Sequence, residues 1–159
     1  MIQVNRVLHP TDFSAPSDHA ARYACALADR FNAELHLLHI VASLVAALPE
    51  IDPSQSAHVD DYGELVKQLK ADAERKMDEL LKAVGCSIQG VVCASEEGAP
   101  FVQIIRYAKE HDIDLIVMGT HGRTGLSHMM MGSVAERVVR KATCPVLTVP
   151  PEGHDFVMP

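Results

Sequence analysis

Short apolar runs alternate with segments of helical periodicity from one end of the chain to the other, and this alternation restricts the fold more than any other feature. The runs are as long as β-strands and occupy residues 3–9, 34–41, 88–94, 113–119 and 146–149. Between most of them, apolar residues recur every three or four positions, as on the buried face of a helix. Strands that alternate with helices through right-handed crossovers predict an α/β fold: an open five-stranded parallel sheet with helices on both faces.

Four segments are predicted to be helical. The first follows the cap candidates Asp12 and Ser14 and carries apolar residues at positions 20, 24, 27, 28 and 31. The clearest helix starts at Asp61 and stops at Gly85, and its apolar face consists of Leu65, Leu69, Ala73, Met77, Leu80, Leu81 and Val84. A third spans about residues 99–111, and the last opens at Ser133 and is expected to bury Ala135, Val138, Val139 and Ala142.

Domain organisation and location follow from length and composition. At 159 residues and 48% hydrophobic, the chain can bury one core, so we expect one domain over residues 1–150 and a tail over 151–159. Residues 43–60 contain prolines and no sustained period, which predicts a long loop. No apolar stretch approaches the roughly 20 residues of a membrane span, and the first residues lack the layout of a signal peptide, so we expect a cytoplasmic protein with no membrane partner.

Charge and cysteine content exclude further classes of protein. The formal net charge is −7 and the 14 basic residues are scattered, which argues against a nucleic-acid partner. The four cysteines form no CxxC pair and are expected to be buried free thiols rather than ligands of a metal or members of a redox site.

Two loops are candidates for a ligand site. In an open parallel sheet a ligand binds beyond the carboxyl ends of the strands, where the strand order reverses. If strands 3–9 and 113–119 are neighbours at that reversal, the segment HPTDFS and the loop GTHGRTGLSHMMMGS face one crevice. The strand order is an assumption at this point.

The second loop has the spacing Gly119-x2-Gly122-x9-Gly132-Ser133. Glycines at positions 119 and 122 can adopt positive φ and let a ligand approach the backbone, and residues 132–134 present free amides at a helix N-terminus, which favours phosphate. The loop is neither a Walker A motif nor a GxGxxG motif. The alternative is that these glycines only turn the chain and that Ser133 is an ordinary N-cap.

With these motifs the chain resembles the universal stress protein family in its nucleotide-binding form, whose loop reads G-x2-G-x9-G-[ST]. The likeness covers nearly the whole chain, through VNRVLHPTDFS, MGTHGR and GSVAERVVRKATCPVLTV. It implies a Rossmann-like fold of the adenine nucleotide alpha hydrolase type. It also implies ATP as the ligand, although the family contains members that do not bind ATP.

The resemblance also assigns residues to the site. It places adenine near Pro10, Thr11, Asp12 and the backbone of Val41, with Met118 beside the pocket. It places the phosphates near Gly119, Gly122, Arg123, Gly132, Ser133 and Val134. Asp12 could instead cap the first helix, and Arg123 could be a solvated loop residue. We expect Mg²⁺ to be held mainly by phosphates and water, since His121 and His128 are poorly spaced as metal ligands.

The predicted function is an ATP-binding, nucleotide-dependent regulatory or stress-response module with no catalytic residues. Two alternatives remain open: a slow ATP hydrolase, and a dimeric interaction protein that does not need nucleotide. The short apolar strand 146–149 is expected at a sheet edge, where pairing with a second copy would give a homodimer, and the resemblance points the same way. The sequence names no protein partner and no stress signal.

Overall fold

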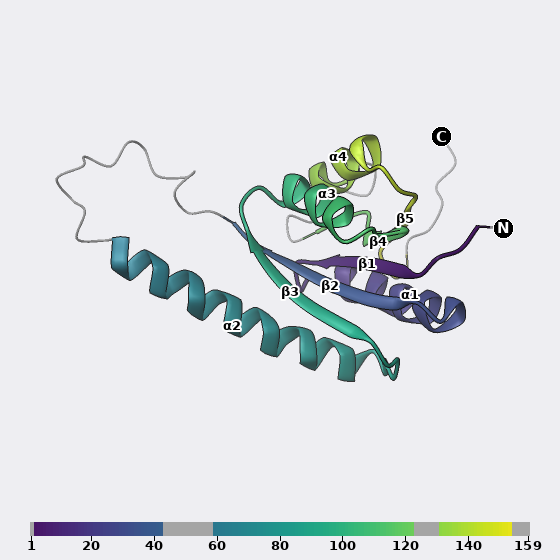
Figure 1. Ribbon diagram of the computed structural model, residues 1–159, viewed down its shortest axis with the longest axis horizontal. Helices are drawn as coiled ribbons and strands as arrows, with labels where there is room; N and C mark the ends of the chain where they lie inside the picture. The colour runs from purple at the N-terminus through teal and green to yellow at the C-terminus, as the bar shows by residue number, and fades with distance from the viewer. Residues whose placement is uncertain (1, 43–58, 123–130, 154–159) are drawn as a thin grey trace.

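The computed structural model describes residues 2–42, 59–122 and 131–153. Strands and helices alternate as predicted, in the order β1 (Arg6–Thr11), α1 (Ala15–Phe31), β2 (Glu34–Val41), α2 (Val59–Ala83), β3 (Val91–Glu97), α3 (Pro100–Glu110), β4 (Leu115–Gly119), α4 (Ser133–Lys141) and β5 (Val146–Val149). All five strands lie in one parallel sheet of order β3-β2-β1-β4-β5 (Figure 1). The predicted fold is confirmed, and β1 and β4 are neighbours where the strand order reverses.

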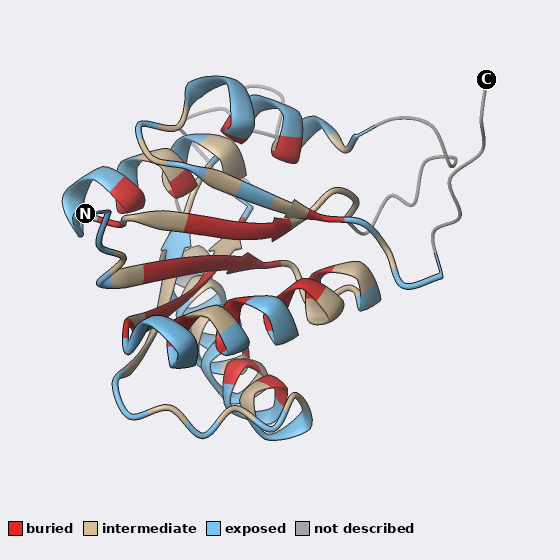
Figure 2. Ribbon diagram, turned by 90° about the vertical axis from the view of Figure 1, so that its right-hand side faces the viewer, coloured by how far each residue is buried: buried red, intermediate tan, exposed pale blue. Residues whose placement is uncertain are grey.

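The sheet is covered on both faces, and each face has its own apolar core. Alternate residues of β1 enter opposite cores, since Val7 packs with residues of α1 and α2 and Leu8 packs with residues of α3 and α4. Both side chains are fully buried, as are Leu35 and Ile116 on the adjoining strands. Figure 2 shows the inner strands β2, β1 and β4 buried along most of their length, with the buried residues of the helices turned toward the sheet. Two-sided burial explains why these strands are almost continuously apolar.

Helix α1 begins where the sequence predicted it, because both cap candidates contribute. Ser14 is the N-cap and accepts a hydrogen bond from the backbone N–H of Ser17 at 3.4 Å. The Asp12 carboxylate accepts from the N–H of Ser14 at 3.0 Å and from its hydroxyl at 2.6 Å. Asn32 ends the helix in the left-handed conformation with φ 53°. The turn between β1 and α1 is therefore held in place by its own side chains.

Three strands differ from the prediction in their bounds, including β4, which was expected from residue 113 and begins at Leu115. β1 was expected to end before Pro10 but continues to Thr11, because its other neighbour, β2, pairs with it up to Thr11 and His39. β3 was expected at residues 88–94 but spans Val91–Glu97. Its last residues are polar and still pair with β2, which an edge strand in contact with solvent permits. Apolar content located these strands without giving their ends.

Several burial predictions were also wrong. Val139 is 45% exposed on α4, and Leu65 and Leu69 are 40% and 38% exposed on α2. Of the four cysteines only Cys25 is buried, although all four are free. The predicted loop 43–60 lies mostly outside the described residues, and α2 already begins at Val59. None of the helices in the described ranges combines the length and apolarity needed to cross a membrane.

Candidate functional site

A cavity of about 280 Å³ lies beyond the carboxyl ends of β1 and β4, where the prediction placed a ligand. β1 and the turn after it supply one wall, the end of β4 and the glycine loop supply another, and α3 and α4 close it. Its lining consists of Pro10, Thr11, Asp12, Ser17, Leu38, Ile40, Pro100, Ile104, Met118, Gly119, Thr120, His121, Gly122, Gly132, Ser133, Val134 and Ala135.

The wall after β1 is a tight turn. Phe13 has a φ of 59°, which is unusual for an aromatic residue, and its N–H donates to the Thr11 hydroxyl at 3.0 Å. Its ring packs on His39 with centroids 4.6 Å apart, and the Lys76 ammonium lies 5.6 Å from the ring centre. These contacts hold Phe13 on the α2 side of the sheet, and Asp12 lines the cavity beside it.

The wall after β4 requires glycine for a different reason from the one predicted. Among described glycines, those with positive φ are Gly85, Gly90, Gly98 and Gly153, so the expectation of positive φ at 119 and 122 is wrong. Their close surroundings disfavour a side chain: a Cβ would crowd backbone oxygens at Gly119 and Gly132, and at Gly122 it would require the Asp12 carboxylate to move. A Cβ on Gly122 would lie 2.6 Å from Oδ2 of Asp12, and one on Gly119 would lie 3.1 Å from the Pro16 carbonyl oxygen. A Cβ on Gly132 would lie 3.2 Å from the Thr120 carbonyl oxygen. The loop folds back against itself and α1 too closely for larger residues.

Helix α4 presents its amino terminus to the cavity. Its N-cap is Gly132, which provides no side-chain hydrogen bond, and Ser133, Val134 and Ala135 line the cavity. Ser133 is the first helical residue, so the alternative of Ser133 as the N-cap is wrong. The first amides of a helix have no partners within it, and the helix dipole places partial positive charge there. This end of the cavity is therefore suited to an anion.

Most of the predicted binding residues come together in this cavity, and Val41 does not. Val41 is 6% exposed and absent from the lining, and its carbonyl already accepts a hydrogen bond from the Gly98 N–H at 3.0 Å. Arg123 lies outside the described residues. The prediction missed the apolar wall made by Leu38, Ile40 and Ile104. Strand alternation could have found part of it, since Leu38 and Ile40 share one face of β2.

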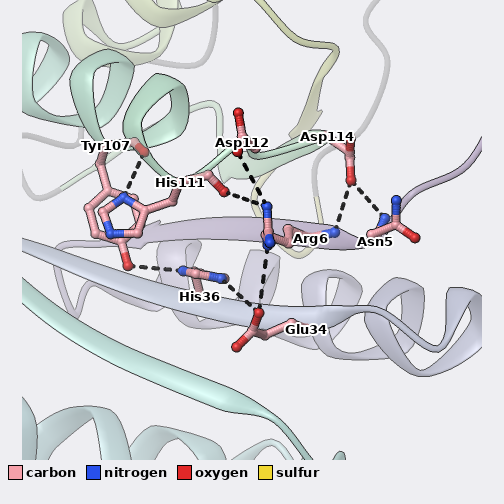
Figure 3. A network of polar contacts seen from close by, with 8 residues as sticks. All are labelled: Asn5, Arg6, Glu34, His36, Tyr107, His111, Asp112 and Asp114. Carbon is pink, nitrogen blue, oxygen red and sulfur yellow. Dashed lines mark hydrogen bonds and ion pairs between the residues drawn. The ribbon is translucent and has the colours of Figure 1, made fainter.

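A second polar cluster lies away from the cavity, near the amino ends of the strands (Figure 3). The Asp114 carboxylate accepts from the backbone N–H groups of Asn5 and Arg6 at 2.7 and 3.1 Å, which joins the start of β1 to the turn before β4. Buried His36 contacts the Tyr107 hydroxyl at 2.9 Å, and Tyr107 stacks on His111 with ring centres 3.8 Å apart. Burial lowers the pKa of His36 and raises that of Tyr107 to about 12. The cluster fixes the amino ends of the strands.

Comparisons with known proteins agree with the fold. The model of the "Universal stress protein family" matches residues 3–150. The chain is similar to Universal stress protein MJ0531 of Methanocaldococcus jannaschii, with 36% identity over 91% of this chain and 81% of that protein. The solved structure of MJ0577 from the same organism superposes with a TM-score of 0.81 at 28% identity, covering 96% of this chain and 99% of that one. A universal stress protein solved in complex with cAMP shares the fold at 23% identity, with a TM-score of 0.64 and coverage of 95% and 100%.

Proposed function

This chain belongs to the universal stress protein family, and from that premise we propose that it is an ATP-binding regulatory module that acts in the cytoplasm. Its output is a nucleotide-dependent change in the order of the loops around the cavity or in the affinity for a partner. The proposal treats residues 1–150 as one domain and residues 151–159 as a tail.

The observation that carries the proposal is the chemical polarity of the cavity. Part of its lining is apolar, with Leu38, Ile40, Ile104 and Met118 available to contact a flat base. The lining also includes the amino terminus of α4, whose first backbone N–H groups suit phosphate, whereas the N–H of Gly132 already donates to the Thr120 carbonyl at 2.7 Å. An adenine nucleotide has an aromatic base at one end and phosphates at the other, and so matches both.

Asp12 is the residue best placed to assist a cation between protein and phosphates. Its carboxylate lies beside Gly122, in the same cavity as the α4 terminus, and it also supports the cap of α1. Mg²⁺ prefers oxygen ligands and keeps several waters, so one carboxylate acting through water with the phosphates is sufficient. We include Mg²⁺ in the proposal on this ground.

Mass spectrometry of natively purified, then denatured protein tests the function directly. We expect intact ATP to be released, and we expect calorimetry with Mg²⁺ and millimolar ATP to show binding on protein freed of nucleotide. Release of ADP with continued turnover would favour the slow hydrolase. Absence of heat on nucleotide-free protein would contradict ATP binding and favour an interaction protein that does not need nucleotide.

We also propose that β5 pairs with the β5 of a second copy to form a homodimer. β5 lies at one edge of the sheet, and its Leu147 is 38% exposed. An uncovered apolar edge strand favours association with another strand, and two-fold pairing satisfies both copies. The first residues of the tail contact α1, where a carboxylate oxygen of Glu152 lies 3.8 Å from the side-chain nitrogens of Arg22 and His19.

A further inference from the structure

The two neighbours of β1 pair with it over different lengths. With β2, pairing runs from Arg6 and Glu34 to Thr11 and His39, the full length of β1. With β4, it covers only Val7–Leu115 and Leu8–Ile116. β4 itself continues to Gly119, paired with β5. The contact between β1 and β4 therefore ends before either strand does.

Pro10 explains where this pairing ends. In a parallel ladder, every second residue of a strand bonds to a given neighbour, donating its N–H to the residue before its partner and accepting from the residue after it. Ile116 donates its N–H to Pro145 on the β5 side, so Leu8 is the bonded member of the pair with Ile116. Because Leu8 faces Ile116, the next bond of the ladder would run from the N–H of residue 10 to the carbonyl of Val117. Proline has no N–H, so that bond cannot form. The Val117 carbonyl would be left without a donor in a buried part of the sheet.

His9 supplies the missing donor with its side chain. Its Nδ1 lies 2.8 Å from the Val117 carbonyl oxygen, and both residues are fully buried. A carbonyl can only accept, so Nδ1 carries the proton. Nε2, the other ring nitrogen, is buried without a hydrogen-bond partner among the described residues. Burial lowers the pKa of His9 to about 4, which keeps the ring neutral at pH 7.

The cavity begins immediately beyond this replacement. Pro10 and Thr11 on β1, and Met118 and Gly119 on β4, follow the last paired residues and line the cavity. If the ladder continued, backbone hydrogen bonds would draw these two segments to the spacing of paired strands, about 4.8 Å. Pro10 ends the pairing, and His9 supplies the hydrogen bond that the buried Val117 carbonyl would otherwise lack.

We propose that His9 and Pro10 form a positioning pair that ends the β1–β4 ladder and thereby keeps the cavity open for the nucleotide. The nucleotide part of this inference rests on the proposed function. His9 lines no part of the cavity and acts through the Val117 carbonyl, so its effect on binding is indirect.

Stability measurements without nucleotide test the shared acceptor. His9→Phe keeps a ring of similar size but leaves Val117 without a donor, so its thermal midpoint should fall. Adding Pro10→Ala restores a backbone N–H that can reach Val117, and the midpoint of the double variant should recover. His36→Phe is the matched control, because His36 is also buried and hydrogen-bonded but lies away from this carbonyl. Pro10→Ala should not rescue it. The proposal would be overturned if Pro10→Ala did not raise the midpoint of His9→Phe, or if it raised the midpoints of His9→Phe and His36→Phe equally.

Calorimetry with Mg²⁺ and ATP tests positioning. Pro10→Ala alone is the reference, because it loses the same cavity-lining ring while His9 still donates to Val117; against that reference, His9→Phe/Pro10→Ala, stable but with a continued ladder, should bind at least about tenfold more weakly. An affinity of the double variant equal to that of Pro10→Ala would overturn the positioning role. Failure of wild type itself to bind ATP would overturn the proposed function, while the stability rescue would still decide whether His9 and Pro10 share an acceptor.

Nitrogen NMR of wild type gives a readout that a purely steric role would not predict. The two ring nitrogens of a neutral histidine have distinct shifts, so the spectrum at pH 7 identifies the protonated one. We expect His9 to be protonated on Nδ1, and protonation on Nε2 would contradict the bond to Val117.

Discussion

At the scale of single residues, the glycine loop is closely packed because its glycines have no side chains. Gly119, Gly122 and Gly132 adopt backbone angles open to other residues, and crowding by neighbouring atoms rather than φ disfavours a Cβ. The tightest approach joins Gly122 to the Asp12 carboxylate across the cavity. A larger residue there would displace the group that also supports the cap of α1.

Gly122→Val should abolish detectable ATP binding while the protein still unfolds cooperatively. Its branched side chain would displace Asp12 and enter the space of the phosphates. Ser133→Ala removes one hydroxyl and leaves the amides of α4, so it should cost only roughly 0.5–1.5 kcal/mol of binding free energy. Calorimetry beside thermal unfolding measures both effects. Equal losses of affinity in the two variants would contradict the backbone-donor account.

Histidine burial predicts how stability depends on pH. Burial lowers the pKa of His9 to about 4 and also lowers that of His36, from an ordinary value of 6.5. Below pH 6.5 the folded protein therefore binds fewer protons at these histidines than the unfolded chain does. The stability that depends on these neutral rings is therefore fully present above pH 6.5 and is lost as the pH falls toward 4. For His9 the loss is on the order of 3 kcal/mol.

Urea unfolding of wild type and His9→Phe at pH 7.0 and 4.5 measures this contribution. The difference in unfolding free energy between the two proteins should narrow at the lower pH. Only wild type loses stability there, because its folded state keeps His9 neutral while its unfolded state binds a proton at this residue. A difference that is unchanged or wider at pH 4.5 would contradict the burial of a neutral ring.

Sequence reasoning found the polar residues of the cavity more readily than its apolar ones. Asp12 and Ser133 stand out because hydroxyl and carboxyl groups at helix starts have few common uses. Leu38 and Ile104 look like any core residue, and only the packing of β2 against α3 shows that they border a cavity. His9 went unnoticed because its role follows from a strand register that apolar patterns do not specify.

At the scale of elements, α2 shows how periodicity can predict a helix without predicting what covers it. Ala73, Met77 and Leu80 are buried as its apolar stripe requires, but Leu65 and Leu69 on the same stripe are partly exposed. Figure 1 shows the amino-terminal turns of α2 extending past the sheet. The stripe is longer than the surface it covers.

Truncations along α2 should therefore differ in cost according to position. Met77→Ala, at a fully buried site, should lower the unfolding free energy by about 2–4 kcal/mol. Leu69→Ala, at a site 38% exposed, should cost less than about 1 kcal/mol. Denaturant unfolding of both variants compares them. Similar costs would mean that Leu69 is covered in solution.

At the scale of the whole molecule, strand order decides which edges are open. β3 and β5 are the outer strands. The polar carboxyl end of β3 makes that edge a poor surface for association, whereas β5 is short and apolar. Both strands were found from the sequence, and β5 was expected at an edge, but only the strand order of the structure shows that β3 occupies the other edge.

Leu147→Lys should shift the protein from dimer to monomer in light scattering at tens of micromolar, with ATP affinity nearly unchanged. Val149 is unsuitable for the same test because it is only 3% exposed and lies in the α1 core. Leu69→Lys is the control, since Leu69 matches Leu147 in exposure and lies on α2, which packs on β2 and β3. A monomeric wild type, or a dimer that survives Leu147→Lys, would count against pairing through β5.

The two walls of the cavity lie far apart in the chain, and this separation has a consequence during translation. Residues 10–12 of one wall leave the ribosome early, but the other wall needs Gly119, Gly122 and the start of α4. A nascent chain that ends before Ser133 has strands and helices to fold but no amino terminus of α4 to receive phosphates. On the proposed function, nucleotide bound to such a chain would meet only the apolar part of the lining, so tight binding would require translation to have passed the start of α4.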